Sequence, residues 1–310
     1  MESLTEMQHQ VRALASEKDT IILSHNYQLP EIQQVADIVG DSLVLASKAV
    51  DAGHRNILLC GVRFMAETAA ILNPEKNVLM PDLDARCPMA EMVDAETVRI
   101  LKDRYPGVPV VAYVNTTADI KAEADICCTS ANSVDVVRSL PQKQVIMVPD
   151  CNLSLYTKRF FPEKDIIMPA GYCPTHQAGI TPEAILEVKR KHPGAVVLVH
   201  PECIPEVIDM SDGAFSTEGM AKYVAGSDAR EFIVGTEKEH AYRLSSMFPG
   251  KVFHPLPTAI CPNMKKNTIT KVLKSLESMQ YSVTVPEDVA ERARRALDAM
   301  LEVGRSRLEE

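Results

Sequence analysis

The sequence predicts an α/β protein that contains three copies of one unit, each a small parallel sheet with helices on both sides. Continuously apolar, β-rich runs alternate with helix-like runs through the 310 residues, which is typical of parallel strands buried on both faces. Polar landmarks recur along the chain at intervals of 86 to 88 residues. The composition, with 46% hydrophobic and 24% charged residues, is that of an ordinary globular protein.

The landmarks begin at the ends of three strand-like runs, "TIILSHNY" (20–27), "VPVVAYVN" (108–115) and "GAVVLVHPE" (194–202). Two polar positions correspond in these runs. The first is occupied by His25, Tyr113 and His200, and the second, two residues later, by Tyr27, Asn115 and Glu202. Three later sets keep the same register: Ser42, Ser130 and Thr217; Pro74, Pro162 and Pro249; Cys87, Cys173 and Cys261. A loose recurrence of strands and helices would not align polar positions so closely, so we infer an internal triplication.

The triplication divides the chain into three units. Unit one spans residues 1–105 and carries Cys87, unit two spans 106–192 and carries Cys173, and unit three spans 193–310 and carries Cys261.

The elements can be assigned in order in unit one. An amphipathic surface helix is predicted over residues 1–18. Strands are predicted over 20–25, 56–60 and 77–80, and helices near 31–38 and over 42–52, 63–72 and 90–104. The tail "VPEDVAERARRALDAMLEVG" has proline at a helix start and apolar residues at 289, 293, 296, 297 and 300. We expect it to form a helix that packs across the units.

Charge and patterning exclude several classes of function. The net charge of −9 argues against nucleic acid or an anionic membrane as the main partner. No apolar run approaches the roughly 18 residues that a membrane span needs, and the N-terminal residues do not resemble a signal peptide. Eight cysteines without a secretory signal indicate a reducing compartment, so we expect a cytoplasmic protein without disulfides.

Chemistry is expected beyond the carboxyl ends of the strands, where ligands of parallel sheets gather. Ser42, Ser130 and Thr217 each precede a helical run. Each could simply cap its helix. Three equivalent hydroxyl-bearing helix ends would equally suit a phosphate near a pseudo-threefold axis.

The three repeated cysteines would converge if the strand ends of the units face a common axis. Three thiolates bind a soft metal centre. Zinc in a structural site takes a fourth ligand, often with C-x-x-C spacing, which this chain lacks. Three thiolates fit a [4Fe–4S] cluster with one open iron, a Lewis acid suited to dehydration or condensation. The other cysteines do not repeat in register and are predicted to be small buried residues: Cys60, Cys127, Cys128, Cys151 and Cys203.

The remaining polar landmarks form a plausible acid–base set around such a centre. They are His25, Tyr27, Tyr113, Asn115, His200 and Glu202, with His176 beside Cys173. Nucleotide-binding loops and a serine-hydrolase elbow do not occur in the sequence.

Five stretches together resemble the quinolinate synthase family: "SHNYQLPEIQQVADIVGDSLVLA", "CGVRFMAETAAILNPEKNVLMPD", "AYVNTTADIKAEADICCTSAN", "HPEC" and "CPNMKKNT". The resemblance runs from about residue 20 to residue 303. It implies three αβα units arranged in a triangle around a central active site. It also implies an enzyme that condenses iminoaspartate with dihydroxyacetone phosphate to quinolinate, releasing phosphate and water, in NAD biosynthesis.

The resemblance implies roles for individual residues. One [4Fe–4S] cluster per chain would be held by Cys87, Cys173 and Cys261. Phosphate or carboxylate groups would be held by His25, Ser42, Ser130, His176, His200 and Thr217, with Ser216 also among the substrate-binding residues. Intermediates would be positioned, or protons moved, by Tyr27, Tyr113, Asn115 and Glu202, and Met65 would line the cavity. Some relatives carry C-x-x-C-x-x-C near the third cysteine, but this chain has only "CPNM", so disulfide regulation is not expected there.

Other functions remain open at this stage. A different cluster-dependent hydro-lyase would need no phosphate pocket. A non-enzymatic iron–sulfur sensor would not need the His, Tyr and Glu set, and a zinc-stabilised scaffold would hold a different metal. Partners are expected to be the small-molecule substrates, with possible coupling to an aspartate oxidase or dehydrogenase that produces iminoaspartate, and neither nucleic acid nor membrane.

Overall fold

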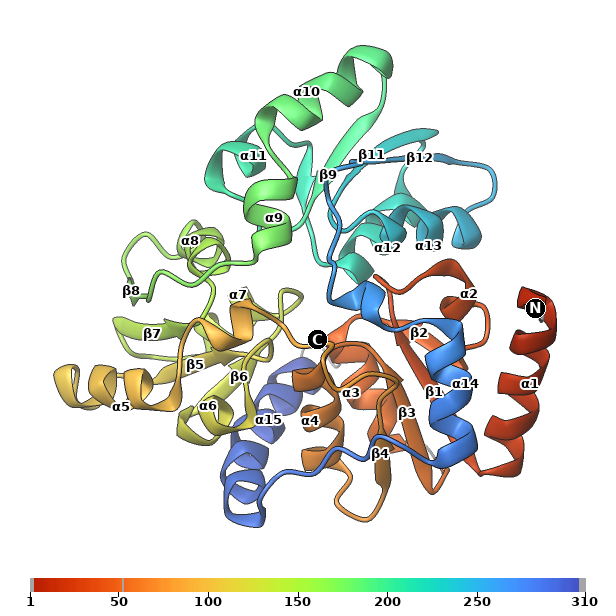
Figure 1. The fold of residues 1–310 in the computed structure, drawn as a ribbon. Coiled ribbons are helices and arrows are strands. Elements are labelled where there is room, and N and C mark those ends of the chain that lie inside the picture. Colours follow the sequence, from red (N-terminus) through yellow and green to blue (C-terminus); the bar gives the residue numbers. More distant parts are fainter. Residues whose placement is uncertain (1–2, 52, 307–310) are drawn as a thin grey trace.

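A computed structural model describes residues 3–51 and 53–306, with side chains of the last helix described to residue 303. It contains three four-stranded sheets that lie at the corners of a triangle (Figure 1). Every strand pair in them is parallel. The strand orders are β2-β1-β3-β4, β6-β5-β7-β8 and β10-β9-β11-β12. The same order in each sheet confirms the α/β class and three αβα units.

Unit one holds the first sheet between two helix layers. Its elements are α1 (Leu4–Glu17), β1 (Thr20–His25), α2 (Pro30–Gln33), β2 (Ile38–Gly40), α3 (Ser42–Asp51), β3 (Asn56–Cys60), α4 (Arg63–Leu72), β4 (Asn77–Leu79) and the 3-10 turn η1 (Met89–Glu91). The next helix, α5 (Ala95–Arg104), packs in the core of the second sheet. Strand β1 sends Ile22 toward α1 and α14 (Ile269–Ser278), and sends Ile21 and Leu23 toward α3 and α4. The strand is therefore buried on both faces, as its continuous apolar run predicts.

Units two and three repeat this arrangement. Unit two has β5 (Val110–Tyr113), α6 (Ala118–Glu123), β6 (Ile126–Cys128), α7 (Ser133–Ser139), β7 (Gln144–Val148), α8 (Cys151–Lys158), β8 (Asp165–Ile167), α9 (Pro174–Gly179) and α10 (Pro182–Lys191). The last helix of unit two, α10, packs on the sheet of unit three. Unit three has β9 (Val196–Val199), α11 (Pro205–Asp209), β10 (Gly213–Ala214), α12 (Thr217–Gly226), β11 (Glu231–Gly235), α13 (Glu239–Met247), β12 (Val252–Pro255), the 3-10 turn η2 (Met264–Lys266), α14 and α15 (Glu287–Ser306).

Most of the elements predicted in unit one are confirmed, with small changes at their ends. The helix predicted near 31–38 is wrong in its second half, because α2 ends at Gln33 and strand β2 begins at Ile38. The helix predicted from residue 90 begins at Ala95, where the Asp94 carboxylate accepts the backbone N–H of Thr97 and caps it. The strand predicted over 77–80 ends at Leu79. Residues 1, 2 and 52 of the predicted helices lie outside the described residues.

A repeated aspartate joins the first two strands of every unit. The carboxylates of Asp37, Asp125 and Asp212 accept the backbone N–H groups of Ile22, Val110 and Val197 at 2.8, 2.8 and 2.7 Å. The backbone N–H of each aspartate donates in return to the carbonyl of the same partner. These aspartates are 88 and 87 residues apart, so they are a further landmark of the triplication. They fix where the second strand of each sheet begins.

Helix α15 confirms the prediction for the tail. Its apolar face, made of Val289, Ala293, Ala296, Leu297 and Met300, is buried. It packs against α6 and β6 of unit two and against α4 of unit one (Figure 1). Arg294 donates to the carbonyl of Ile71 at the end of α4, and Arg292 pairs with Glu123 of α6. Among the described residues, no helix combines the length and apolarity that crossing a membrane requires.

Candidate active site

A central cavity lies where the carboxyl ends of the three sheets meet. Its empty volume is about 710 Å³, part of which is open to solvent, within the range of small-molecule sites. The cavity wall includes every predicted site residue except Ser216: His25, Tyr27, Ser42, Met65, Cys87, Tyr113, Asn115, Ser130, Cys173, His176, His200, Glu202, Thr217 and Cys261. Ser216 instead caps α12, where its hydroxyl accepts the backbone N–H of Gly219 at 3.1 Å.

The repeated hydroxyls are not the helix caps. The Asp41 carboxylate accepts the N–H of Val44 at the start of α3, and Ser216 caps α12. The residue that precedes α7 is Asn132, not Ser130. Because neighbouring residues take these positions, the hydroxyls of Ser42, Ser130 and Thr217 are left to face the cavity. The interpretation that these three residues only cap their helices is therefore wrong.

Two buried histidines reach the cavity in the same local conformation. The Nδ1 atoms of His25 and His200 each accept the backbone N–H two residues later, from Tyr27 and Glu202, at 3.2 Å. These bonds assign the proton of each neutral ring to Nε2. Burial, as the largest cause, lowers the pKa of both histidines to about 3. Both rings are therefore neutral Nε2–H donors at physiological pH, and His200 Nε2 lies 3.1 Å from the Ser130 hydroxyl.

Glu202 is the charged centre of the site. Its side chain is 4% exposed, and one oxygen lies 2.7 Å from His176 Nδ1. The other oxygen accepts from Asn115 Nδ2 at 3.3 Å, and Tyr113 also hydrogen-bonds the carboxylate. Burial acts to raise the pKa of Glu202. The attraction of His176 and the hydrogen bonds outweigh burial and lower this pKa to about 2.

A hydrogen-bonded chain connects Glu202 to Tyr27. The Tyr27 hydroxyl lies 2.6 Å from Thr236 Oγ1, which lies 2.9 Å from His176 Nε2. His176 Nδ1 then contacts Glu202. Because a hydroxyl can donate and accept at once, Thr236 can pass a proton between Tyr27 and His176. Burial raises the pKa of Tyr27 well above its ordinary value, so Tyr27 stays protonated and can donate.

Each unit positions its cysteine with the same backbone bond. The N–H groups of Arg63, Cys151 and Lys238 donate to the carbonyls of Ala85, Gly171 and Ala259 at 2.8, 2.7 and 2.8 Å. Each accepting residue lies two positions before the repeated cysteine. This bond ties the loop after the fourth strand to the start of the preceding helix. It brings one thiol from each unit to the cavity wall.

Buried acids support two of these loops. Glu237 accepts the backbone N–H of Cys261 at 3.3 Å and pairs with Lys265 at 2.9 Å. Asp150, at the corresponding position of unit two, accepts a backbone hydrogen bond from Cys173. Burial raises the pKa of Asp150 well above its ordinary value, and the nearby charge of Glu202 adds to this. In both units a buried acid therefore accepts the backbone N–H of the repeated cysteine.

The three thiols fit a soft metal centre. Burial raises the pKa of Cys87 to about 12, and it also raises the pKa of Cys173 and Cys261. The thiols lie close enough that a charge on one acts on the others. Without a nearby cation all three are neutral thiols, and a bound metal would deprotonate them. Cys173 also lies within 4.8 Å of donor atoms of His176 and Glu202.

The other cysteines are all free. Cys60, Cys127, Cys128 and Cys203 are fully buried, as predicted, whereas Cys151 is half-buried.

Several site residues were missed in the sequence. Asp41 and Thr129 directly precede the hydroxyl landmarks and also line the cavity. Thr236 follows strand β11, so its place after a strand end was the available signal. Phe64, Met89 and Met264 give the cavity apolar walls, and their sequence positions carry no repeated landmark.

Comparisons with known proteins agree with one another. The family model described as quinolinate synthetase A protein matches residues 9–302. The quinolinate synthase of Thermodesulfovibrio yellowstonii is 49% identical over 293 residues, covering 94% of this chain and 96% of the relative. The quinolinate synthase of Methanoregula boonei is 51% identical over 302 residues, covering 97% and 99%. That of Dehalococcoides mccartyi strain 195 is 51% identical over 296 residues, covering 95% and 97%.

Proposed function

The chain belongs to the quinolinate synthase family and is an enzyme of the synthase type in NAD biosynthesis. From that premise we propose that it condenses iminoaspartate with dihydroxyacetone phosphate to quinolinate, releasing phosphate and water. The observation that carries the proposal is one cavity lined by three thiols, three hydroxyls and the set of His, Tyr, Asn and Glu side chains. A condensation followed by dehydration needs such a combination of anion-binding, acid–base and Lewis-acid groups.

We propose that Cys87, Cys173 and Cys261 hold one [4Fe–4S] cluster. Three thiols from three units are the donor set that such a cluster takes. A cluster with three protein ligands supplies an open iron that acts as a Lewis acid toward a hydroxyl or carboxylate oxygen. The cavity side chains perform the other tasks.

Anionic substrate groups would be held mainly by neutral donors. The hydroxyls of Ser42, Ser130 and Thr217 face the cavity together with the Nε2–H groups of the two neutral histidines. Asn26 Nδ2 donates to Thr217 Oγ1 at 2.9 Å, which leaves the Thr217 hydroxyl proton available to an anion. Neutral donors bind phosphate through several hydrogen bonds without a fixed countercharge, so phosphate released by the reaction can leave.

Proton movement would centre on Glu202. In the present arrangement its low pKa makes it a weak base. A substrate that takes over the hydrogen bonds of Tyr113 and Asn115 would remove part of this stabilisation and raise the pKa of the carboxylate. Glu202 then accepts a proton from the substrate. His176, Thr236 and Tyr27 lead protons to or from the other side of the cavity.

Metal analysis of the purified protein tests the cofactor. Protein prepared without oxygen should contain about four irons and four sulfides per chain, and Cys87→Ser, Cys173→Ser and Cys261→Ser should each lose them. Cys151→Ser is the matched control, because Cys151 is a half-buried cysteine that does not line the cavity. Zinc in place of iron would support the alternative that the protein is a zinc-stabilised scaffold. Iron that survives all three changes would refute the converging-thiol site.

Two assays separate the enzyme from its rivals. Quinolinate formation from iminoaspartate and dihydroxyacetone phosphate should be lost in the three cysteine variants and retained in Cys151→Ser. A hydro-lyase acting on an unphosphorylated acid would keep its activity in Ser42→Ala and Ser130→Ala, whereas the proposed reaction would slow. An iron–sulfur sensor would form no quinolinate at all.

We also propose functional coupling to an enzyme that produces iminoaspartate, an aspartate oxidase or dehydrogenase.

A further inference from the structure

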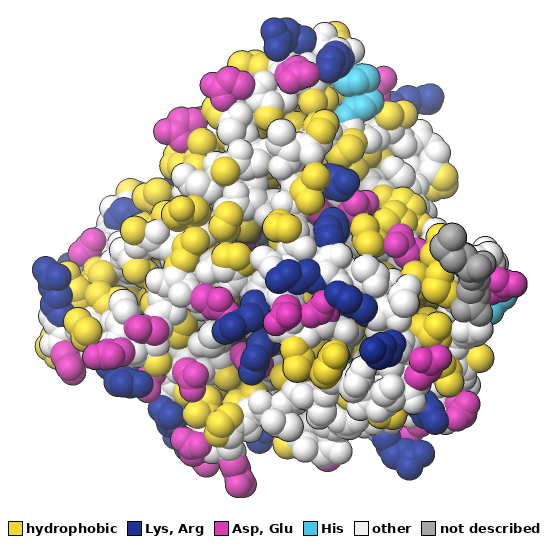
Figure 2. All heavy atoms as spheres, viewed as in Figure 1, with side chains coloured by type: hydrophobic (Ala, Val, Ile, Leu, Met, Phe, Trp, Pro, Cys, Tyr) yellow, Lys and Arg dark blue, Asp and Glu magenta, His cyan; other side chains and the backbone are white. Residues whose placement is uncertain are grey.

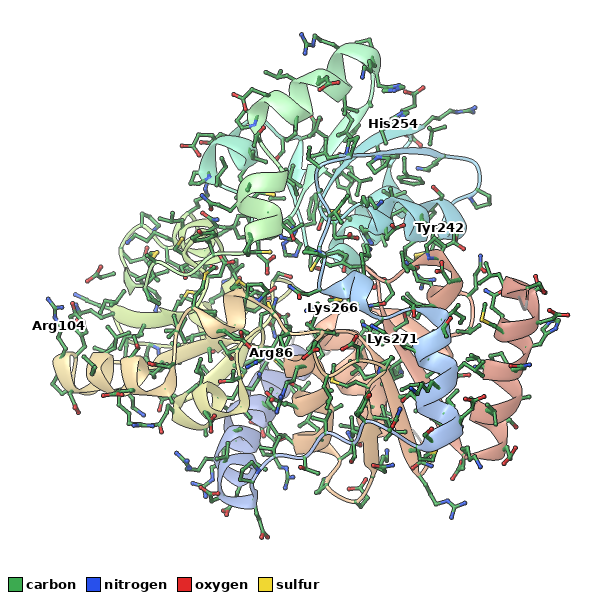
Figure 3. All side chains as sticks on the ribbon, viewed as in Figure 1. Arg86, Arg104, Tyr242, His254, Lys266 and Lys271 are labelled. Carbon is green, nitrogen blue, oxygen red and sulfur yellow. The ribbon has the colours of Figure 1, made fainter. Side chains whose placement is uncertain are left out.

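A second cluster of metal-ligating side chains lies on the outer side of unit three. His192 follows α10, Glu231 begins β11, and His254 lies in β12. Figure 3 labels His254 at this end of the molecule, and Figure 2 shows histidine side chains at the surface there. Because Glu231 is at the amino end of its strand, the cluster is at the opposite end of the sheet from the central cavity.

The donor atoms have the spacing of a metal site. Glu231 Oε2 lies 3.7 Å from His192 Nδ1 and 3.5 Å from His254 Nε2, and all three donor atoms are within 4.8 Å of one another. Ligand atoms about 2.1 Å from a tetrahedral zinc ion are about 3.4 Å apart. The two rings stack with centroids 3.5 Å apart at 20°. An ion would require them to turn apart about their Cβ–Cγ bonds, and His192, 35% exposed, has room to turn.

His254 contains a polar atom that the surrounding protein does not satisfy. Its side chain is 17% exposed, and its Nε2 atom is buried without a hydrogen-bond partner among the described residues. Such atoms are uncommon in folded proteins and call for an ion, a water molecule or strain to explain them. Glu231, the acid closest to this nitrogen, lies beside it without forming a hydrogen bond. A cation between the two atoms would satisfy both.

The other two units act as an internal control. In the shared register, the positions of Glu231 and His254 are occupied by Gln144 and Ile167 in unit two, and by Asn56 and Leu79 in unit one. His192 directly precedes unit three, and the corresponding residue directly before unit two is Tyr105. The fold therefore accepts residues that cannot bind a metal at all of these positions. At the position of His254, the other two units have apolar residues. Requirements of the sheet therefore do not explain why two histidines and a glutamate gather at this end of the third sheet.

We propose that His192, Glu231 and His254 bind Zn²⁺ or a similar divalent transition metal. Two imidazoles and one carboxylate are a known zinc donor set that leaves the fourth position to water or an exogenous ligand. Lys191 and Arg230 line the adjoining surface hollow. Their charges oppose a dication and favour an anion as the fourth ligand. A bound ion would join the end of α10 to strands β11 and β12.

The test uses cluster-loaded enzyme handled without oxygen. The protein is equilibrated with zinc, separated from free metal, and analysed for zinc and iron in the same sample. We expect about one zinc per chain in the unmodified protein. Glu231→Gln and His254→Ile, which introduce the residues of unit two, should lose this zinc while iron content stays unchanged. His9→Ala, which removes an exposed histidine of α1, is the matched control and should retain it.

The zinc content of the unmodified protein and of the two ligand variants decides whether the proposed site exists. Zinc that is absent from the unmodified protein, or bound equally by Glu231→Gln and His254→Ile, would overturn the proposal. If His254→Ile fails to fold, the half-exposed Glu231→Gln still decides, because this change leaves the packing of His254 intact. A second readout is thermal unfolding. Zinc should raise the unfolding temperature of the unmodified protein and of His9→Ala, and should leave that of both ligand variants unchanged.

Discussion

Glu202 is the only carboxylate among the predicted site residues, and it is held by donors from strand β5, from the loop that follows β5 and from helix α9. We expect Glu202→Gln to lower the rate of quinolinate formation by roughly 10² to 10⁴, because the amide cannot accept a proton. Iron content should be unchanged. Glu206→Gln, an exposed acid four residues away, should keep full activity. Unchanged activity in Glu202→Gln would remove this residue from the role of base.

Buried neutral histidines predict how stability depends on pH. Burial, the largest cause, lowers the pKa of His25, His200 and His240 to about 3. Below pH 6.5 the unfolded chain binds protons that the folded chain excludes, so the free energy of unfolding falls as pH drops from about 6.5 toward 3. Each histidine contributes about 1.4 kcal/mol per pH unit in this window.

Urea unfolding at pH 7.5 and 5.5 measures this loss. The three histidines together should lower the free energy of unfolding by about 4 kcal/mol at the lower pH. His240→Gln should remove about a third of the difference between the two pH values, whereas His9→Gln, at an exposed position, should not change it. A pH-independent free energy of unfolding would show that these rings take up protons in the folded protein as readily as in the unfolded chain.

Individual residues differ in how well the sequence could identify them. His25, Ser42 and Cys87 were found because equivalent positions in the other units carry similar chemistry. Thr236 and Asp41 were missed because their contribution depends on contacts with residues far away in the chain or on a neighbour taking over a cap. The proposed zinc site was missed for the opposite reason: its ligand residues do not recur at corresponding positions, so the comparison of units does not reveal them.

Among the elements, the short second strand of each sheet depends most on a single side chain. Asp125 accepts the N–H of Val110 at 2.8 Å and so sets the start of β6 beside β5. We expect Asp125→Ala to lower the free energy of unfolding by about 1–2 kcal/mol, because the buried N–H of Val110 loses its charged acceptor. Urea unfolding is the measurement. Asp103→Ala, an exposed aspartate on α5, should change stability by less than about 0.5 kcal/mol.

The same aspartate explains the one element that was predicted wrongly. Residues 34–38 continue an apolar, helix-compatible pattern after α2, but the side chain and backbone of Asp37 bond to Ile22 across 15 residues. Tertiary hydrogen bonds of this kind override local propensity. Long strands such as β1 and β3 were predicted correctly, since their apolar runs are continuous and both faces are buried.

For the whole molecule, α15 is the element that joins units. Leu297 is fully buried in the core that α15 shares with unit two. We expect Leu297→Ala to lower the free energy of unfolding by about 2–5 kcal/mol, while Asp298→Ala, on the exposed side of the same helix, has little effect. Equal stability of the two variants would mean that the tail contributes little to the fold.

The arrangement of units in a triangle was predicted from the repeat and the family resemblance together, since periodicity alone does not place units relative to one another.

The position of α15 also has a consequence for synthesis on the ribosome. The hydrophobic core of unit two includes Val289, Ala293, Ala296, Leu297 and Met300. These residues leave the exit tunnel after every strand of unit three has been translated, because strand β12 ends at Pro255. The core of unit two therefore cannot be completed until α15 has been translated. Vectorial folding would complete the third sheet first, because the first sheet packs against α14 and the second against α15, and both helices follow strand β12.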